Sequence, residues 1–284
     1  MTDSAIRLPS QFTDRVRDIV EGRVQPTPPR DASTVLLLRP VPPTDTGGGF
    51  EVYLLRRTRS MAFAPGAHVF PGGSVDPRDA DTELAWAGPD PAAWGRILNG
   101  SAELARALIC AAVRETFEES GVLLAGPAPD AVVTDTTDDS FEADRMALID
   151  RSLSLAEMLQ KRRLVLRADL LTPWSRWITP VIEGRRFDTR FFAAALPPGQ
   201  RTRDVSGEAD KVAWLSPSAA IAAARQGEIA LMPPTAVSLA ELSRYGSAEA
   251  ALAAGGDMAP RQPGVALVDG APWLTIPGGL EYPL

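Results

Sequence analysis

Short apolar runs divide the first part of the chain and predict two β-strands, STVLLLRP (33–40) and FEVYLLRR (50–57). Both runs are rich in aliphatic and β-branched residues, and the turn-forming segment PPTDTGGG joins them. The runs that predict further strands are RLVLRADL, WSRWITP, RFDTRFFAAAL and DKVAWLS. The segment RTRSMAFAPGAHVFPGGSVDP contains several glycines and prolines, so we expect an irregular loop there.

Helical patterns alternate with these strands in no regular order. One long helix fits residues 101–120, with Ser101 as its N-cap and Gly121 just beyond its C-terminus. Shorter helices are expected at residues 10–21, 154–162, 217–226 and 234–244. Because the strands and helices do not repeat as regular βαβ units, the pattern favours an α/β (α+β) sandwich over a doubly wound fold.

The end of the long helix, AAVRETFEESGV (111–122), concentrates carboxylates. On a helix, Glu115, Glu118 and Glu119 fall within one stripe ~100° wide. The opposite side carries the residues expected to face the core, which are Ile109, Cys110, Val113 and Phe117. One interpretation is a solvated acidic face in which Arg114 and Glu118 form an i, i+4 pair. However, three carboxylates at a helix C-terminus oppose the helix dipole, and a hard divalent cation such as Mg²⁺ or Mn²⁺ would offset that repulsion.

Two motifs resemble the box of the Nudix hydrolase superfamily, GX5EX7REUXEEXGU, in which U is a bulky aliphatic residue. Residues 114–121 match REXXEEXG, with Thr116 departing at the first U and Val122 fitting the last, and residues 70–73 read FPGG. About thirty extra residues separate the two halves. The segments AFAPGAHVFPGGSVD, RETFEESGVLL, RRFDTRFFAAALP and VAWLSPSAAI resemble the branch that includes the peroxisomal coenzyme A diphosphatases, whose box carries such an insertion. The likeness covers most of residues 33–240.

This resemblance implies a Nudix fold, with a mixed β-sheet between helices. We expect an N-terminal extension at residues 1–30 and a Nudix hydrolase domain at 31–246. The insertion in the box, at about 76–100, should form a lid or wall beside the cleft. A C-terminal helical appendage should lead into a tail at 247–284.

Residue roles follow from the same resemblance. Glu115 and Glu119 would be the main metal ligands, with Glu118 as a further ligand or a water-orienting carboxylate. The backbone carbonyl of Gly72 is another candidate ligand, and Arg114 would hold the glutamates in orientation. The metal would neutralise charge on the phosphates and activate a water for attack on phosphorus, while a nearby carboxylate takes the proton.

Several assignments stay open. The glutamate expected between the box halves falls on Asp79 when counted from Gly73 and on Arg106 when counted back from Arg114, and Glu103 lies nearby. Glu208, in SGEADKVAW, is a candidate catalytic carboxylate or general base, with a solvated loop position as the alternative.

Arginines supply the candidate substrate contacts. The residues with a possible phosphate-binding role are Arg56, Arg57 and Arg59 before the glycine loop, and Arg185, Arg186 and Arg190 around RRFDTRFF. For the first cluster, an exposed strand end is the alternative. The tryptophans are interpreted as packing residues, although Trp86 and Trp94 lie in the insertion and could shape a cleft.

Composition narrows the class of function. A formal net charge of −7 argues against a nucleic-acid-binding surface. The single cysteine, Cys110, excludes an intramolecular disulfide and suits a reducing compartment, and the single histidine, His68, excludes a His-based triad or zinc site. The chain shows neither a signal-peptide core nor a run of about 18 apolar residues. We therefore expect a cytoplasmic protein with a small-molecule nucleotide substrate and no membrane or nucleic-acid partner; a homodimer stays open.

The expected activity is Mg²⁺- or Mn²⁺-dependent hydrolysis of the phosphoanhydride in a nucleoside diphosphate linked to another group. Branch resemblance makes coenzyme A or acyl-coenzyme A the leading substrate, giving 3′,5′-ADP and (acyl-)4′-phosphopantetheine. A bacterial coenzyme A motif, LLTxT[SA]x3Rx3Gx3FPGG, is only partly present, because Ala62 stands where its arginine belongs. The alternatives are hydrolysis of ADP-ribose or another nucleotide derivative, and a catalytically silent Nudix-fold ligand-binding module. The intact set of three glutamates argues against the silent module.

Overall fold

A mixed β-sheet forms the centre of the molecule. The computed structural model describes residues 5–44, 47–58, 66–203, 209–277, 280 and 282–284. The strand order is β12-β4-β3-β2-β10-β9-β13, with β11 also pairing β3 and β5 also pairing β2. The bounds are β2 Arg30–Thr44, β3 Gly47–Arg57, β4 Ala67–Val69, β5 Gly72–Ser74, β9 Thr172–Ile178, β10 Phe187–Ala195, β11 Ala209–Leu215, β12 Ala230–Leu231 and β13 Pro260–Arg261. Strand β2 runs parallel to β10 and antiparallel to β3.

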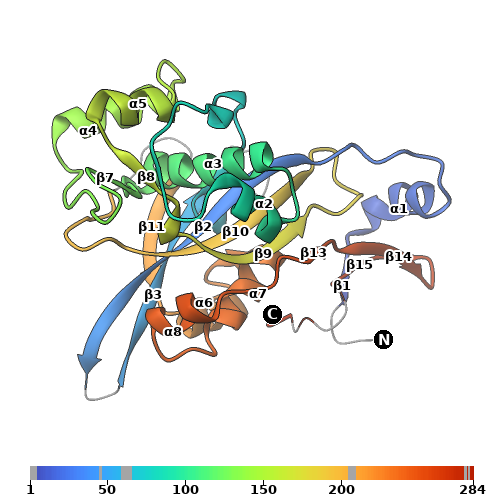
Figure 1. The fold of residues 1–284 in the computed structure, drawn as a ribbon. Helices are drawn as coiled ribbons and strands as arrows, with labels where there is room; N and C mark the ends of the chain where they lie inside the picture. Colours follow the sequence, from blue (N-terminus) through green and yellow to red (C-terminus); the bar gives the residue numbers. More distant parts are fainter. Residues whose placement is uncertain (1–4, 45–46, 59–65, 204–208, 278–279, 281) are drawn as a thin grey trace.

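Side chains of the central strands alternate between two hydrophobic cores, one on each face of the sheet. On β2, Val35 and Leu37 belong to one core, whereas Leu36 and Leu38 belong to the other. Because both faces are covered, the strand reads as one apolar run and not as an alternation of apolar and polar residues. Helices lie above and below the sheet (Figure 1), which confirms the predicted sandwich.

The helices that cover the two faces come from different parts of the chain. Their bounds are α2 Pro91–Leu98, α3 Ala102–Ser120, α4 Asp139–Ile149 and α5 Leu155–Arg162 on one side, and α6 Pro217–Arg225, α7 Pro233–Leu242 and α8 Ala248–Ala254 on the other. A further helix, α1 Thr13–Val20, lies to one side of the sheet (Figure 1). Helices α1, α3, α5, α6 and α7 were predicted. Helices α2, α4 and α8 were not predicted: α2 and α8 lie in segments interpreted as insertion and tail, and α4 falls in a segment for which no element was predicted.

One predicted strand belongs to a separate small sheet. The run RLVLRADL forms only β8, Val165–Arg167, before a 3₁₀ turn at Ala168–Leu170. Strand β8 pairs with β6, Trp86–Ala87, and β7, Ala125–Gly126. This sheet ties the insertion to the segment that follows α3.

The insertion packs against the long helix α3, mainly through α2. Asp90 caps α2, since its side chain accepts a hydrogen bond from the Ala93 N–H. Trp94 on α2 is only 2% exposed and packs edge-on against Phe192, with 6.0 Å between ring centroids. The indole of Trp86 lies under the guanidinium of Arg106, which stands 5.5 Å from the ring centroid.

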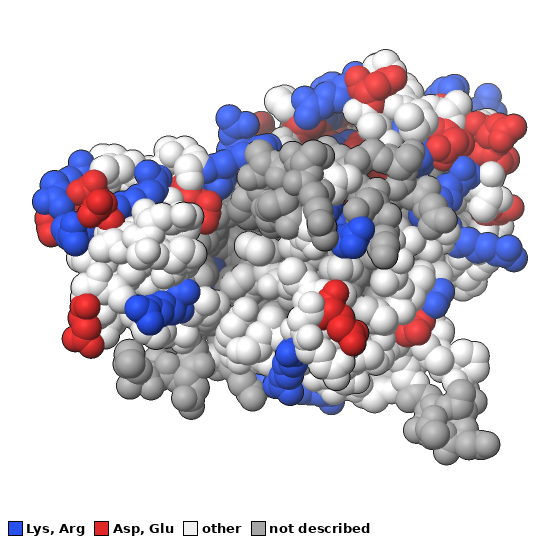
Figure 2. All heavy atoms as spheres, turned by 180° about the vertical axis from the view of Figure 1, so that it is seen from behind, with Lys and Arg blue, Asp and Glu red and all other residues white. Residues whose placement is uncertain are grey.

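The two ends of the chain meet in a third sheet. Strand β1, Ala5–Arg7, pairs antiparallel with β15, Ala271–Thr275, which in turn pairs with β14, Gly264–Val268. The segments predicted as an N-terminal extension and a C-terminal tail therefore contact each other. Strands β1 and β15 lie at the same side of the molecule (Figure 1). On the face shown in Figure 2, basic and acidic side chains are interspersed. Within the described residues, no helix combines the length and apolar character that a membrane span requires.

Candidate active site

The long helix α3 is held on nearly all sides. Ser101 caps its N-terminus by accepting a hydrogen bond from the Leu104 N–H, and Gly121 ends it in the left-handed conformation at φ 74°. The predicted core residues Ile109, Cys110, Val113 and Phe117 are all buried. The other side also contains buried residues, among them Ala111, Ala112 and Thr116, so the glutamates do not lie on a freely solvated face.

Arg114 is the centre of the charged cluster. Its Nε and Nη2 donate to the two carboxylate oxygens of Asp79, each at 3.0 Å. Its Nη1 donates to Glu115 at 2.8 Å and to Glu118 at 3.1 Å. The carbonyl of Ser74 accepts another bond from Nη2 at 3.0 Å. Crowding of carboxylates on α3 is therefore offset in part by one guanidinium with a rigid set of donors.

Asp79 occupies the position that sequence counting left open between the two box halves. It is 3% exposed and pairs with Arg114 through both oxygens. Counting forward from Gly73 identified it, whereas counting back from Arg114 led to Arg106, which stacks on Trp86. Glu103 is exposed in the first turn of α3.

The glycine loop approaches α3 so closely that side chains would not fit. The Gly72 N–H donates to Glu119 Oε2 at 2.8 Å. A Cβ atom at Gly72 would stand 2.4 Å from Thr34 Oγ1, and one at Gly73 would stand 2.4 Å from Glu115 Oε1. Gly73 therefore allows the loop to lie directly against Glu115, and Gly72 allows it to lie directly against β2.

Burial disfavours the charged forms of these carboxylates. It raises the pKa of Glu115 to about 7, although Arg114 acts in the opposite direction. Burial also raises the pKa of Glu118 and of Asp79, again against Arg114. One guanidinium faces more carboxylates than it can neutralise, and carboxylate oxygens are the donors that Mg²⁺ and Mn²⁺ prefer. The donor set therefore fits a divalent cation.

The glutamates are not already arranged around a cation. Among the described residues, no group of three His, Cys, Asp or Glu side chains converges as a ligand set. Glu115 and Glu118 instead point to Arg114, and Glu119 accepts from the backbone of Gly72. Binding a metal here would require these carboxylates to turn from their present partners.

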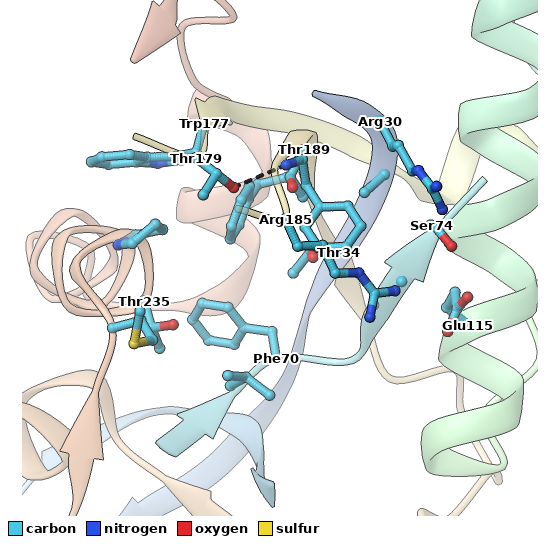
Figure 3. A pocket seen from close by; sticks show the side chains of 18 of the residues that line it. Arg30, Thr34, Phe70, Ser74, Glu115, Trp177, Thr179, Arg185, Thr189 and Thr235 are labelled. Carbon is cyan, nitrogen blue, oxygen red and sulfur yellow. Dashed lines mark hydrogen bonds between the residues drawn. The ribbon is translucent and has the colours of Figure 1, made fainter. Parts of the chain in front are cut away.

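The cluster opens onto a cavity of about 940 Å³. All five residues predicted on the two box halves line it, namely Gly72, Arg114, Glu115, Glu118 and Glu119. In Figure 3, Glu115, Ser74 and Arg30 lie at one end of the cavity, and Trp177 and Thr235 lie at the other. The cavity is near the upper limit of the range typical of ligand sites, roughly 300–1,000 Å³.

Only some of the arginines predicted to bind substrate line the cavity. Arg57 and Arg185 line the cavity, whereas Arg56 does not. Arg190 is 2% exposed, lies outside the cavity lining and pairs with Asp31 at 2.7 Å and with Asp188 at 3.1 Å. The assignment of Arg190 to substrate binding therefore finds no support, since its guanidinium is used inside the sheet.

The remaining predicted residues do not add to the site. Arg186 is buried and donates to the carbonyls of Thr179 and Thr27, at 2.9 and 2.8 Å. Arg59 and Glu208 lie outside the described residues. Trp86 and Trp94 do not line the cavity, so within the insertion only its first residues, 76–78, form a wall.

Cys110 is a buried thiol on the core side of α3. It is 2% exposed, and burial raises its pKa to about 12, so the thiolate is strongly disfavoured. Sequence reasoning did not identify four arginines of the cavity lining, namely Arg30, Arg78, Arg145 and Arg151. None of them lies in a motif, and no local pattern marks them.

The α/β sandwich, the capped helix α3 with its glutamates, and the glycine loop beside it together define a Nudix-type protein. The crystal structure of a NUDIX hydrolase from Alicyclobacillus acidocaldarius is similar, with a TM-score of 0.67 and 26% identity over 82% of this chain and 99% of that one. A family model described as the NUDT19 Nudix domain matches residues 99–244, about half of the chain, and the chain belongs to this family.

Proteins with similar sequences are named acyl-coenzyme A diphosphatases or Nudix hydrolases. The chain is 29% identical over 233 residues to the acyl-coenzyme A diphosphatase NUDT19 of Xenopus laevis, covering 69% of this chain and 60% of that protein. Identity to the Homo sapiens protein of the same name is 29% over 234 residues, with coverages of 70% and 62%. A putative nudix hydrolase 7 of Caenorhabditis elegans is 30% identical over 68% of this chain and 56% of its own length. The chain thus spans somewhat under two thirds of these relatives.

Proposed function

We propose that the chain is a Mg²⁺- or Mn²⁺-dependent pyrophosphohydrolase of coenzyme A or acyl-coenzyme A. Its products would be 3′,5′-ADP and (acyl-)4′-phosphopantetheine. The observation that carries this proposal is the cluster of Asp79, Arg114 and the α3 glutamates at one end of a cavity that several arginines also line. The names of the frog and human relatives support the choice of substrate.

Glu115, Glu118 and Glu119 would hold the cation, with the Gly72 carbonyl as a further ligand. A bound divalent cation supplies charge neutralisation at the diphosphate and an activated water. Arg114 fixes the orientation of Glu115 and Glu118 through its Nη1. Glu118 is the proposed water-orienting carboxylate, and Glu208 is the proposed acceptor of the water proton.

Three arginines of the cavity lining are the proposed phosphate contacts, namely Arg30, Arg57 and Arg185. Within the described part of the chain, neither Arg30 nor Arg185 pairs with a carboxylate; the guanidinium of Arg185 instead lies 5.2 Å from the ring centroid of Phe187. In a chain with a net charge of −7, the guanidinium groups of Arg30 and Arg185, which have no carboxylate partner among the described residues, suit a substrate with several phosphates. Coenzyme A carries a 3′-phosphate in addition to its diphosphate.

A substrate comparison tests this proposal. With Mg²⁺, coenzyme A should give 3′,5′-ADP and 4′-phosphopantetheine, identified by mass, and dephospho-coenzyme A should be a poorer substrate. Loss of one charge-assisted phosphate contact costs about 1.5–3 kcal/mol, or roughly ten- to a hundredfold in kcat/KM. Arg185→Ala should reduce that preference, whereas Arg96→Ala, at an exposed position on α2 outside the cavity, should not. Equal rates on the two compounds, or faster cleavage of ADP-ribose, would contradict the substrate assignment.

A further inference from the structure

The end of the cavity opposite the glutamates is largely apolar. Its walls come from β9, β10, α7 and the loops beside them, and from residues close to the C-terminus. They include Phe70, Trp177, Phe191, Met232, Pro234 and Tyr282. Figure 3 shows Trp177 and Thr235 at this end, whereas Arg30 lies beside Ser74 and Glu115. A ligand that reaches from one end to the other therefore passes from a charged region into an apolar one.

Trp177 brings an unused hydrogen-bond donor to this end. The side chain is 3% exposed, and its Nε1 is buried without a hydrogen-bond partner. An unsatisfied buried donor is unfavourable, and of the four described tryptophans with an unpartnered Nε1 only Trp177 lines the cavity, where a ligand carbonyl would supply the missing partner.

The start of α7 adds a second polar position. Pro233 and Pro234 occupy its first two residues and have no N–H to offer, so this helix end presents mostly pyrrolidine carbons. Thr235 follows, is 4% exposed and lines the cavity. Its hydroxyl has no hydrogen-bond partner in the described part of the chain. The far end thus combines apolar walls with two separate donors, which suits a neutral acceptor such as a carbonyl better than a phosphate.

We infer that this end binds the pantetheine arm of the substrate, with Trp177 Nε1–H and the Thr235 hydroxyl donating to an amide or thioester carbonyl of that arm. The inference rests on the proposed function and extends it. The adenosine arm of coenzyme A carries a 3′-phosphate on its ribose, and the charge of that phosphate would lose its hydration against the apolar walls. The pantetheine arm is neutral, and its methylene groups, together with an acyl chain, gain from apolar burial.

The two products serve as separate probes of the two arms. We would measure inhibition constants of 4′-phosphopantetheine and of 3′,5′-ADP against coenzyme A hydrolysis. Trp177→Phe removes the donor and keeps an aromatic ring, and Thr235→Val replaces only the hydroxyl. Each should raise the inhibition constant of 4′-phosphopantetheine roughly three- to tenfold and leave that of 3′,5′-ADP unchanged.

The chain offers a matched control for each variant. Trp174→Phe changes another tryptophan of β9 that is 2% exposed, also has an unpartnered Nε1 and does not line the cavity. Ser238→Ala removes a buried, unpartnered hydroxyl of α7 that likewise lies outside the cavity. Neither control should change either inhibition constant, which separates ligand binding from effects on the core.

Two results would overturn the inference alone. One is an equal rise for Trp177→Phe and Trp174→Phe. The other is a rise for 3′,5′-ADP and not for 4′-phosphopantetheine, which would assign the far end to the adenosine arm. Failure of the wild-type protein to hydrolyse coenzyme A would overturn the proposed function and the inference together.

Discussion

Arg114 shows how a single residue makes a crowded acidic site compatible with a folded chain. Its guanidinium joins Asp79, at the start of the insertion, to Glu115 and Glu118 on α3. Breaking such a buried network exposes the remaining charges to an apolar environment, so its members are coupled. Substitutions that remove the charge of a side chain and keep its shape therefore test this network.

The first prediction concerns Glu119→Gln. The amide oxygen can still accept from the Gly72 N–H, now at 2.8 Å from Glu119 Oε2, but the negative charge is lost. Hydrolysis should fall more than about a hundredfold. Without metal, the melting temperature should stay the same or rise, because carboxylate repulsion is relieved. Saturating Mg²⁺ should stabilise the wild type by about 2.7 kcal/mol at 100 times its Kd, and the variant much less.

Thermal melts with and without Mg²⁺, together with a hydrolysis assay, test this prediction. Glu103→Gln is the control, since Glu103 is exposed on the same helix. An active Glu119→Gln protein and a wild type that Mg²⁺ does not stabilise would rule out the metal site.

The second prediction concerns Asp79→Asn. Arg114 would keep its bonds to Glu115, Glu118 and the Ser74 carbonyl but lose its charged partner, which is 3% exposed. We expect a loss of about 2 kcal/mol in the free energy of unfolding and a lower kcat, because Arg114 no longer holds the glutamates rigidly. Chemical denaturation and steady-state kinetics measure the two effects. A variant with wild-type kcat would show that Asp79 supports only the fold.

The third prediction concerns pH. A side-chain hydrogen bond from Arg78 lowers the pKa of Asp76 from its usual 3.8 to about 2. The folded state then binds this proton less tightly than the unfolded state does, so the contribution to stability is present above about pH 4. It is lost as pH falls from about 4 to about 2. Because Arg78 is 40% exposed, we expect a contribution of only about 1 kcal/mol.

Asp76→Asn isolates this effect, since asparagine can still cap the following 3₁₀ turn. The difference in unfolding free energy between wild type and variant should be constant above pH 5 and vanish toward pH 2. A difference that grows in acid would contradict the assigned pKa direction.

At the scale of elements, the two halves of helix α3 have different contacts: one half carries the proposed catalytic cluster, and the other half packs against the insertion. Its C-terminal half faces the glycine loop and the cavity, and its N-terminal half packs against α2 of the insertion. Beyond residues 76–78, the insertion is a structural support and not a wall of the cavity. Changes in α2 should therefore affect stability without affecting the chemistry.

Trp94→Ala tests this division. Truncation of a tryptophan that is 2% exposed should lower the unfolding free energy by about 3–5 kcal/mol. Measured well below the melting temperature, kcat should stay within about twofold of wild type, since Trp94 does not line the cavity. Trp86→Ala, at a half-buried position, should cost less stability. A large fall in kcat at unchanged stability would instead assign the insertion to the active site.

At the scale of the whole molecule, the cavity is completed by the ends of the chain. Ile6 and Leu8 from the N-terminal segment line it, as do Leu274 on β15 and Tyr282. Strand β1 is held there by pairing with β15, and the Leu8 N–H donates to the Pro272 carbonyl at 2.9 Å. The two end segments therefore form part of the wall of the proposed substrate cavity, although both lie far in sequence from the Nudix box.

Deletion of residues 1–8 tests this contribution. The apolar wall loses Ile6 and Leu8, while α3 keeps its contacts with the glycine loop. We expect KM for acyl-coenzyme A to rise roughly three- to thirtyfold with kcat within about twofold. Deletion of residues 1–4, which keeps β1, is the control. An unchanged KM would remove the ends of the chain from the binding site.

The sequence alone determined those features that depend on residues close together in the same helix or strand. Short runs rich in aliphatic and β-branched residues identified β2, β3, β9, β10 and β11, and the caps Ser101 and Gly121 bounded α3 correctly. The spacing of Glu115, Glu118 and Glu119 placed them on one side of that helix. Such patterns are readable because strand period, helix period and capping are local properties of the backbone.

Tertiary structure decided which distant segments meet. The pairing of Asp79 with Arg114, the burial of Arg190 between Asp31 and Asp188, and the wall formed by Trp177 and Thr235 all join residues far apart in the chain. Arg190 and Arg185 belong to the same short sequence run, yet one lies inside the sheet and the other lines the cavity. Such outcomes depend on how the strands register and how the layers pack, and no pattern within a single segment carries that information.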